Sequence, residues 1–116
     1  MKRGSIILIP FYFTDYKGYK LRPALIVSLN QSQTDDFIVA FISTIIPKKN
    51  IIHKTHFVIE NTQSYFLRTG LYTTSIIKCD KLMTINKSVI EGLLGDIPPA
   101  ILSIIDDKLR LALSLQ

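Results

Sequence analysis

Short apolar segments rich in β-branched and aromatic residues follow one another from residue 5 to residue 85, and they limit the folds open to this chain. We expect strands at 5–13, 22–29, 37–46, 56–60 and 71–85. The connections between them do not have the spacing of the helical crossovers that parallel strands require. The sequence therefore predicts a mainly antiparallel sheet.

Individual residues refine these strands. Pro10 indicates an edge position or a bulge in the first strand, and Pro23 is typical of a strand start. The segment 37–46 is apolar enough to be buried on both faces, and the segment 71–85 is expected to bend or split near Asp80.

The last part of the chain has a helical pattern. Residues 86–95 predict a short helix with Asn86 as N-cap and Gly95 as its end, and residues 96–116 predict a longer one. Apolar residues of the longer helix form a wide stripe: Ile101, Leu102, Ile104, Ile105, Leu109, Leu111, Ala112, Leu113 and Leu115. The stripe fits either deep burial against the sheet or a second contact, such as a dimer interface.

At 116 residues the chain is expected to form one domain, 1–116. No segment has the apolar length of a membrane span. The basic start and apolar run at 1–17 resemble a signal peptide, but Pro10 interrupts the run and a small-residue cleavage site is lacking. With Cys79 as the only cysteine, we expect a soluble protein in the reducing cytoplasm.

The positive charge is unevenly distributed. The net charge is +5, and residues 1–94 carry 12 Lys and Arg against 6 Asp and Glu. Two segments without acidic residues concentrate it, 16–22 with Lys17, Lys20 and Arg22, and 47–56 with Lys48, Lys49 and Lys54. This pattern indicates an anionic partner, although loop lysines also serve solubility alone.

Several kinds of chemistry have no support in the sequence. It contains no glycine-rich phosphate loop and no CxxC, HExxH or GxSxG motif. His53 and His56 are three residues apart, but without partner ligands they are expected to be exposed loop residues, and Cys79 a core residue. We therefore predict no metal site.

Arg22 and the hydroxyl pair Ser43 and Thr44 fit a different chemistry. If the second and third strands are antiparallel neighbours, these residues fall at the same end of the sheet, together with both basic segments. A guanidinium beside a hydroxyl can bind a phosphodiester and stabilise the extra negative charge that develops as it reacts.

The segments RGSIILIPFYFTD, KLRPALIVS, DFIVAFIST and TTSIIKCDKLMTINKSVI, with a helix ending LRLALSL, resemble the MazF/PemK family of toxins from bacterial toxin–antitoxin systems. The resemblance covers nearly the whole chain. It implies a mainly β fold with C-terminal helices (α+β), a small SH3-like antiparallel barrel of CcdB/PemK type. It also implies a homodimer, an acidic cognate antitoxin and sequence-specific cleavage of single-stranded RNA.

Carried over by motif, Arg22 falls on the family's catalytic arginine, and Ser43, with Thr44 next to it, on its catalytic threonine. The implied reaction is transesterification by the 2′-hydroxyl of the RNA, without metal or cofactor. In it Arg22 stabilises the phosphorane and is a candidate proton donor. The sequence departs from the family in its serine at the threonine position, in Ser5, and in a loop before Arg22 whose nearest acid is Asp15. Expected RNA contacts are Phe13, Lys17, Tyr19, Lys20, Lys48, Lys49, His53 and Lys54.

Two other functions remain open from the sequence. Proteins of the same fold bind DNA gyrase instead of cutting RNA, in which case the C-terminal helix would be the interacting element. A nucleic-acid-binding module without catalysis would also account for the net charge of +5.

Overall fold

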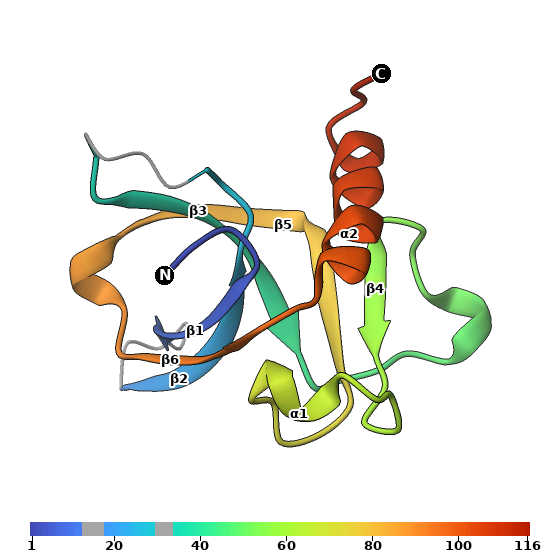
Figure 1. Ribbon diagram of the computed structural model, residues 1–116, viewed down its shortest axis with the longest axis horizontal. Coiled ribbons are helices and arrows are strands. Elements are labelled where there is room, and N and C mark those ends of the chain that lie inside the picture. The colour runs from blue at the N-terminus through green and yellow to red at the C-terminus, as the bar shows by residue number, and fades with distance from the viewer. Residues whose placement is uncertain (13–17, 30–33) are drawn as a thin grey trace.

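A curled antiparallel sheet with one long helix beside it forms the body of the protein (Figure 1). The computed structural model describes residues 1–12, 18–29 and 34–116. Two of the expected RNA contacts, Phe13 and Lys17, lie outside the described residues, as does Asp15, the nearest acid to Arg22 in the sequence. The strands are β1 (Ser5–Tyr12), β2 (Tyr19–Ile26), β3 (Asp36–Ser43), β4 (His56–Ile59), β5 (Ser75–Asn86) and β6 (Gly92–Asp96). The helices are α1 (Phe66–Thr69) and α2 (Pro99–Ala112), with 3-10 turns η1 (Lys49–Ile51) and η2 (Lys87–Val89).

The strand order is β4-β5-β3-β2-β1-β6, and each neighbouring pair is antiparallel. This confirms the predicted mainly β architecture with an antiparallel sheet. The chain curls so that β1, β2, β3 and β6 surround an interior, while β4 and α2 stand beside this curl (Figure 1).

The sheet buries side chains on both faces, and two cores result. The barrel core lies within the curl and consists of Ile7, Ile9, Ala24, Ile26, Phe37, Val39 and Ile85. The helix core lies between the sheet and the helices and includes Ile6, Leu25, Ala40, Ile42, Ile59, Ile77, Cys79 and Ile105. Alternate residues of β3 contribute to each core, as its apolar sequence predicted.

The prediction of a helix at residues 86–95 is wrong. Asn86 does accept a hydrogen bond from the Ser88 amide, at 3.0 Å, but only the turn η2 follows, and Gly92–Asp96 is the strand β6. Gly95 packs closely on α1, because a Cβ at this position would overlap the carbonyl oxygen of Arg68 at the end of that helix. The helix α1, whose close packing on β6 this glycine permits, was not predicted.

The bend expected in β5 near Asp80 is confirmed, and Figure 1 shows the strand changing direction sharply. Leu82 pairs with Ala40 of β3, whereas Lys78 pairs with the next residue, Phe41, so the three residues between them are skipped in the ladder. Pro10 is confirmed at an edge, because β6 pairs with β1 only over Ser5–Leu8. The second strand begins at Tyr19, three residues earlier than predicted, and Pro23 lies within it.

The long helix ends at Ala112, before the expected 116. Ile105 is fully buried, and Ile101, Leu102 and Leu109 pack on the helix core. Ile104, Leu111, Leu113 and Leu115 are exposed, so burial against the sheet accounts for only part of the apolar stripe. Within residues 1–12, 18–29 and 34–116, none of the helices combines the length and apolarity needed to cross a membrane.

Candidate functional site

Two adjacent strands bring Arg22 and Ser43 to the same end of the sheet. In the β2–β3 ladder Ala24 lies opposite Phe41. The ladder ends at this pair, and Arg22 and Ser43 each lie two residues beyond it along their strands, on the face that carries Ala24 and Val39 toward the barrel core. The two residues therefore lie at the edge of the barrel core, where the curl opens.

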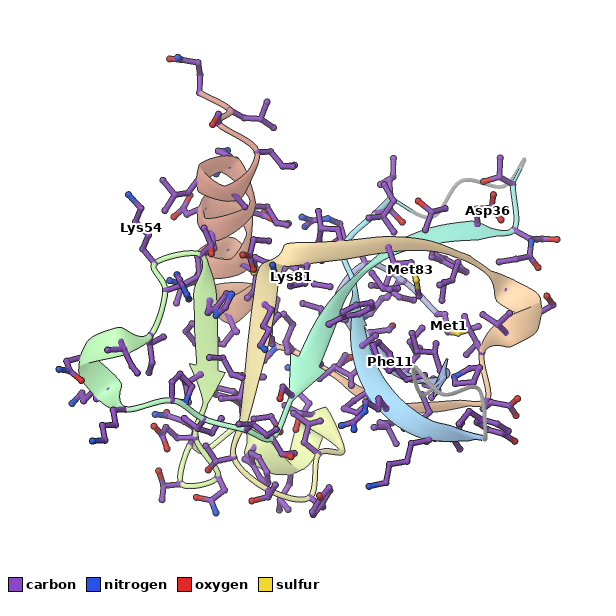
Figure 2. The ribbon with its side chains drawn as sticks, turned by 180° about the vertical axis from the view of Figure 1, so that it is seen from behind. Met1, Phe11, Asp36, Lys54, Lys81 and Met83 are labelled. Atoms are coloured by element: carbon purple, nitrogen blue, oxygen red, sulfur yellow. The ribbon has the colours of Figure 1, made fainter. Side chains whose placement is uncertain are left out.

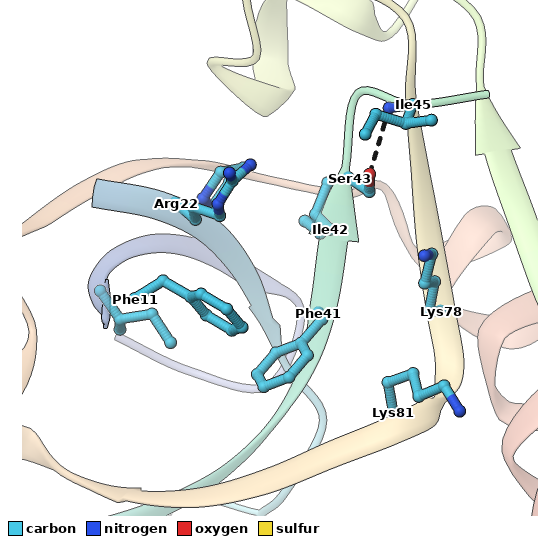
Figure 3. Close-up of a pocket in the computed structure, with 10 residues that line it drawn as sticks. Phe11, Arg22, Phe41, Ile42, Ser43, Ile45, Lys78 and Lys81 are labelled. Atoms are coloured by element: carbon cyan, nitrogen blue, oxygen red, sulfur yellow. Dashed lines mark hydrogen bonds between the residues drawn. The ribbon is translucent and has the colours of Figure 1, made fainter. Parts of the chain in front are cut away.

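A pocket of about 350 Å³ lies at this end, and both residues line it (Figure 3). The other polar side chains on its wall are those of Lys78 and Lys81 of β5, and its apolar wall includes Phe11 and Phe41. Thr44 is the exposed residue after β3, and it is not among the described residues that line the pocket. Of the two candidate hydroxyls, the geometry thus favours Ser43.

Aromatic contacts hold the Arg22 side chain at the pocket. The guanidinium carbon lies 5.9 Å from the centroid of the Phe11 ring, within the range of a cation–π interaction. The Phe11 ring in turn packs edge-to-face on Phe41, with centroids 5.3 Å apart and planes at 83°. The charge therefore rests on a packed aromatic pair, on a strand whose backbone is fixed by its pairing with β1.

The Ser43 hydroxyl is oriented by the backbone that follows it. Its oxygen accepts a hydrogen bond from the Ile45 amide at 3.1 Å (Figure 3). A hydroxyl that accepts one hydrogen bond still has its own proton to donate. Ser43 is therefore arranged as a donor toward an oxygen in the pocket.

Lys78 and Lys81 were not predicted as site residues, because they belong to the strand segment 71–85 and not to either of the two basic segments. Lys78 is the last paired residue before the β5 bend, Lys81 lies within it, and the Lys81 side chain is 60% exposed. The signal was the pattern KCDK at the predicted bend, which places two lysines at the same irregularity of one strand. Two lysines and Arg22 make this end of the sheet attractive to an anion.

A second pocket, of about 490 Å³, adjoins the first and shares Ile45, Lys78 and Lys81 with it. His53 and His56 line it, with their ring centroids 5.0 Å apart. His53 is exposed as expected, but His56 is only 8% exposed, which corrects the expectation that both are exposed. His56 begins β4 and its Nε2 lies 2.7 Å from Oδ1 of Asp80, so β4 packs on β5 without leaving the ring nitrogen unpaired.

Asp80 is ionised at neutral pH. Its partial burial opposes ionisation, but the hydrogen bond and charge of His56, together with Lys81, outweigh this and lower the pKa of Asp80. Oδ2 of Asp80 lies 3.8 Å from Nζ of Lys81, too far for a hydrogen bond, and a hydrogen bond from the backbone of Asp80 itself also helps to lower the pKa of the carboxyl group.

The remaining sequence candidates lie around these pockets. Lys20 is opposite Phe11 in the β1–β2 ladder, and Tyr19 is 56% exposed at the start of β2. Lys48, Lys49 and Lys54 are exposed on the connection from β3 to β4, and in the described parts of the chain none of them lines either pocket. Figure 2 shows Lys54 next to α2, apart from Lys81 on β5, and its carbonyl accepts a hydrogen bond from Lys108 at 2.9 Å.

The remaining reactive groups are the Cys79 thiol and the side chains that could bind a metal ion. Burial raises the pKa of the Cys79 thiol to about 11, which keeps it protonated and confirms a core role. Across the described ranges, no group of three or more His, Cys, Asp or Glu side chains is arranged to hold a metal ion.

Comparisons with known proteins identify the fold. Residues 2–113 match the family model described as PemK-like, MazF-like toxin of type II toxin–antitoxin system. An endoribonuclease from a mycobacterial species, solved with its cognate antitoxin, has 23% identity and a TM-score of 0.73, covering 100% of this chain and 97% of its own. Mycobacterium tuberculosis toxin MazF-mt6 has 18% identity and a TM-score of 0.69, covering 95% and 98%.

The MazE–MazF structure from Deinococcus radiodurans has 18% identity and a TM-score of 0.70, covering 100% of this chain and 98% of that one. A search of curated proteins finds no match. At these identities the solved structures show a shared fold over the whole chain.

Proposed function

Since the chain belongs to the family of PemK-like, MazF-like toxins of type II toxin–antitoxin systems, we propose that it is an endoribonuclease acting on single-stranded RNA. The observation that carries the proposal is that Arg22 and Ser43 line one pocket together with two lysines. The fold is that of proteins named endoribonuclease and toxin MazF-mt6, which supports the same class of reaction.

The reaction that fits these residues is attack of a ribose 2′-oxygen on the adjacent phosphorus. The new O2′–P bond forms as the P–O5′ bond breaks, giving a 2′,3′-cyclic phosphate and a 5′-hydroxyl. The 2′-hydroxyl loses one proton and the departing 5′-oxygen gains one, so the step requires no net proton. No cofactor takes part in this scheme.

Arg22 and Ser43 act on the charge that develops at phosphorus. The guanidinium fork donates hydrogen bonds to the non-bridging oxygens, and its hold on Phe11 limits the reorganisation needed as the phosphorane forms. The Ser43 hydroxyl, whose oxygen already accepts the Ile45 amide, donates its proton to one of the same oxygens. Lys78 and Lys81 supply further positive charge for the phosphates on either side.

Sequence-specific cleavage follows if bases beside the scissile phosphate are held against the protein surface. RNA-binding proteins read unpaired bases by stacking and by contacts to their edges. Tyr19 and Lys20 on β2, together with the lysines of the β3–β4 connection, are the candidates to contact the strand beyond the pocket.

We expect two protein partners. A neighbouring structure is of a toxin with its cognate antitoxin, and the net charge of +5 here suits an acidic one. The exposed apolar residues of α2 and the chain after it suit a homodimer, and light scattering that finds only a 13.2 kDa species at micromolar concentration would contradict it. RNA cleavage of this kind would take place in the cytoplasm.

The test is cleavage of end-labelled single-stranded RNA by purified protein in the presence of EDTA. We expect Arg22→Ala to lower kcat by about 10²-fold or more. Lys87→Ala removes an exposed lysine of η2, directly after β5, that is not among the described residues lining either pocket, so it is the charge control and should cleave normally. Products should carry a 5′-hydroxyl that polynucleotide kinase labels without prior phosphatase treatment.

The alternatives give different results in the same assay. RNA binding without cleavage by the wild-type protein would indicate a nucleic-acid-binding module. Neither binding nor cleavage, with inhibition of DNA gyrase, would indicate a toxin that acts on a protein target. Equal loss of activity in Arg22→Ala and Lys87→Ala would refute a specific role for the guanidinium.

A further inference from the structure

The second pocket has no role in the reaction described above. We call it the His56 pocket, defined by the polar side chains of His53, His56 and Asp80. It is joined to the Arg22 pocket through a shared wall of Ile45, Lys78 and Lys81. A polymer chain held in one pocket can therefore continue into the other.

The strand register sets the distance between the two pockets. Lys78 of β5 lies opposite His56 of β4 on one side and Phe41 of β3 on the other, so His56 is two strands from Phe41, roughly 10 Å between Cα atoms. Ser43 lies a further roughly 7 Å along β3. His56 is thus too far to contact a phosphate held between Arg22 and Ser43. The His56 pocket can take only a neighbouring nucleotide.

The chemistry of the pocket suits a base more than a phosphate. The carboxylate of Asp80 is ionised and would repel a phosphate that entered beside it. The lysines, in contrast, lie on the shared wall between the pockets, where the connecting phosphate would pass. The pocket also offers the exposed ring of His53 for stacking and apolar walls such as Ile51 and Ile76.

Asp80 is the group that can read the base. His56 occupies its Oδ1, while its Oδ2 lies beyond hydrogen-bond distance of Lys81. A carboxylate accepts hydrogen bonds only, so it favours a base edge that carries an exocyclic amine. Uracil has no such amine and presents carbonyl oxygens instead.

We propose that the His56 pocket is a base-binding subsite for the nucleotide next to the scissile phosphate, and that Asp80 selects an amine-bearing base over uracil there. The intervening phosphate lies on Lys78 and Lys81, and His53 stacks on the base. This inference rests on the proposed ribonuclease function, but it can be tested by binding alone.

The binding test uses 2′-O-methyl hexacytidine and hexauridine, which lack the nucleophilic hydroxyl, with Kd measured by fluorescence anisotropy. The wild-type protein should bind hexacytidine about fivefold or more tightly than hexauridine. Asp80→Asn, whose amide both donates and accepts, should remove most of this difference. His53→Ala, at an exposed position, should weaken binding of both probes about fivefold or more. Lys87→Ala should leave the ratio of the two Kd values unchanged and should weaken the binding of both probes only slightly.

The cleavage test locates the same preference along the RNA. Sequencing the ends cut from a random RNA pool should show uracil depleted at one position beside the cut, and Asp80→Asn should restore uracil at that position alone. An unchanged profile in Asp80→Asn and His53→Ala, with cleavage intact, would overturn the subsite and leave the ribonuclease standing. If the RNA pool is not cut but binding still shows a preference for hexacytidine that depends on Asp80, the proposed ribonuclease activity is overturned and the base-binding subsite is supported. Equal Kd values for the two probes would overturn the subsite directly.

Discussion

Replacing Phe11 with leucine tests whether the aromatic pair positions Arg22 for catalysis. The substitution keeps an apolar side chain on β1 but removes the ring that lies 5.9 Å from the guanidinium. An interaction of this kind at a partly exposed site is worth about 0.5–1 kcal/mol. If that energy restrains Arg22 in the transition state, its loss lowers kcat by about 2–5-fold. The loss should be far smaller than that of Arg22→Ala.

The matched control is Phe41→Leu. Both substitutions remove the edge-to-face pair between Phe11 and Phe41, and each should lower the free energy of unfolding by about 0.5–1.5 kcal/mol. Only Phe11→Leu also removes the contact with Arg22, so only this variant should show the additional loss of kcat. Urea denaturation and initial rates on one RNA substrate separate the two effects.

A double-mutant cycle completes the test. In the Arg22→Ala background, Phe11→Leu should lower kcat no further, because the group that Phe11 positions is already gone. If Phe11→Leu lowers kcat equally in both backgrounds, or if Phe41→Leu lowers it as much as Phe11→Leu, the Phe11 ring does not act through Arg22 and the reasoning is refuted.

Three further predictions concern other parts of the chain. Ser43→Ala should lower kcat by about 10²-fold, whereas Ser43→Thr should keep most activity; full activity in Ser43→Ala would exclude the hydroxyl as a donor. Gly95→Ala should lower the free energy of unfolding by about 1–3 kcal/mol and reduce Tm, since a Cβ overlaps the backbone at the end of α1, while Gly92→Ala meets only a methyl of Leu8 at 3.7 Å and should change it little. Because the pKa of Asp80 is lowered from 3.8, its ionised form stabilises the fold above that pH, and this contribution is lost as the pH falls through the lowered value. The unfolding free energy of Asp80→Asn should therefore fall less steeply than that of the wild type below about pH 3.8, and parallel curves would contradict this.

The strands that form the pocket were predictable because each is a continuous apolar run with its own period. Ala24, Ile26 and Val39 fill the barrel core, whereas Leu25, Ala40 and Ile42 fill the helix core, so each strand is apolar on both faces. The prediction failed where the local sequence pattern disagreed with a contact between segments that are distant in the sequence. Residues 86–95 have a helical pattern with a capping residue, yet Gly92–Asp96 forms the strand β6, where Gly95 packs closely on the end of α1.

The polar lining was harder to predict than the strands. Lysine in a charged loop is conspicuous in a sequence, but Lys78 and Lys81 reach the pocket only because three residues of β5 are skipped in its pairing with β3. The partnership of His56 with Asp80 likewise depends on the pairing of β4 with β5, which is not encoded in the spacing of His53 and His56.

The register of β2 on β3 has a consequence for misfolded forms of the protein. Arg22 and Ser43 occupy the same faces of their strands as Ala24 and Val39, which fill the barrel core. A slip of one residue would turn every side chain of a strand to its opposite face. Such a slip would separate the guanidinium from the hydroxyl and at the same time bring core side chains into water. A chain that has lost the arrangement of its reactive groups in this way is therefore also unstable, and a stable but inactive population of misregistered molecules should not accumulate.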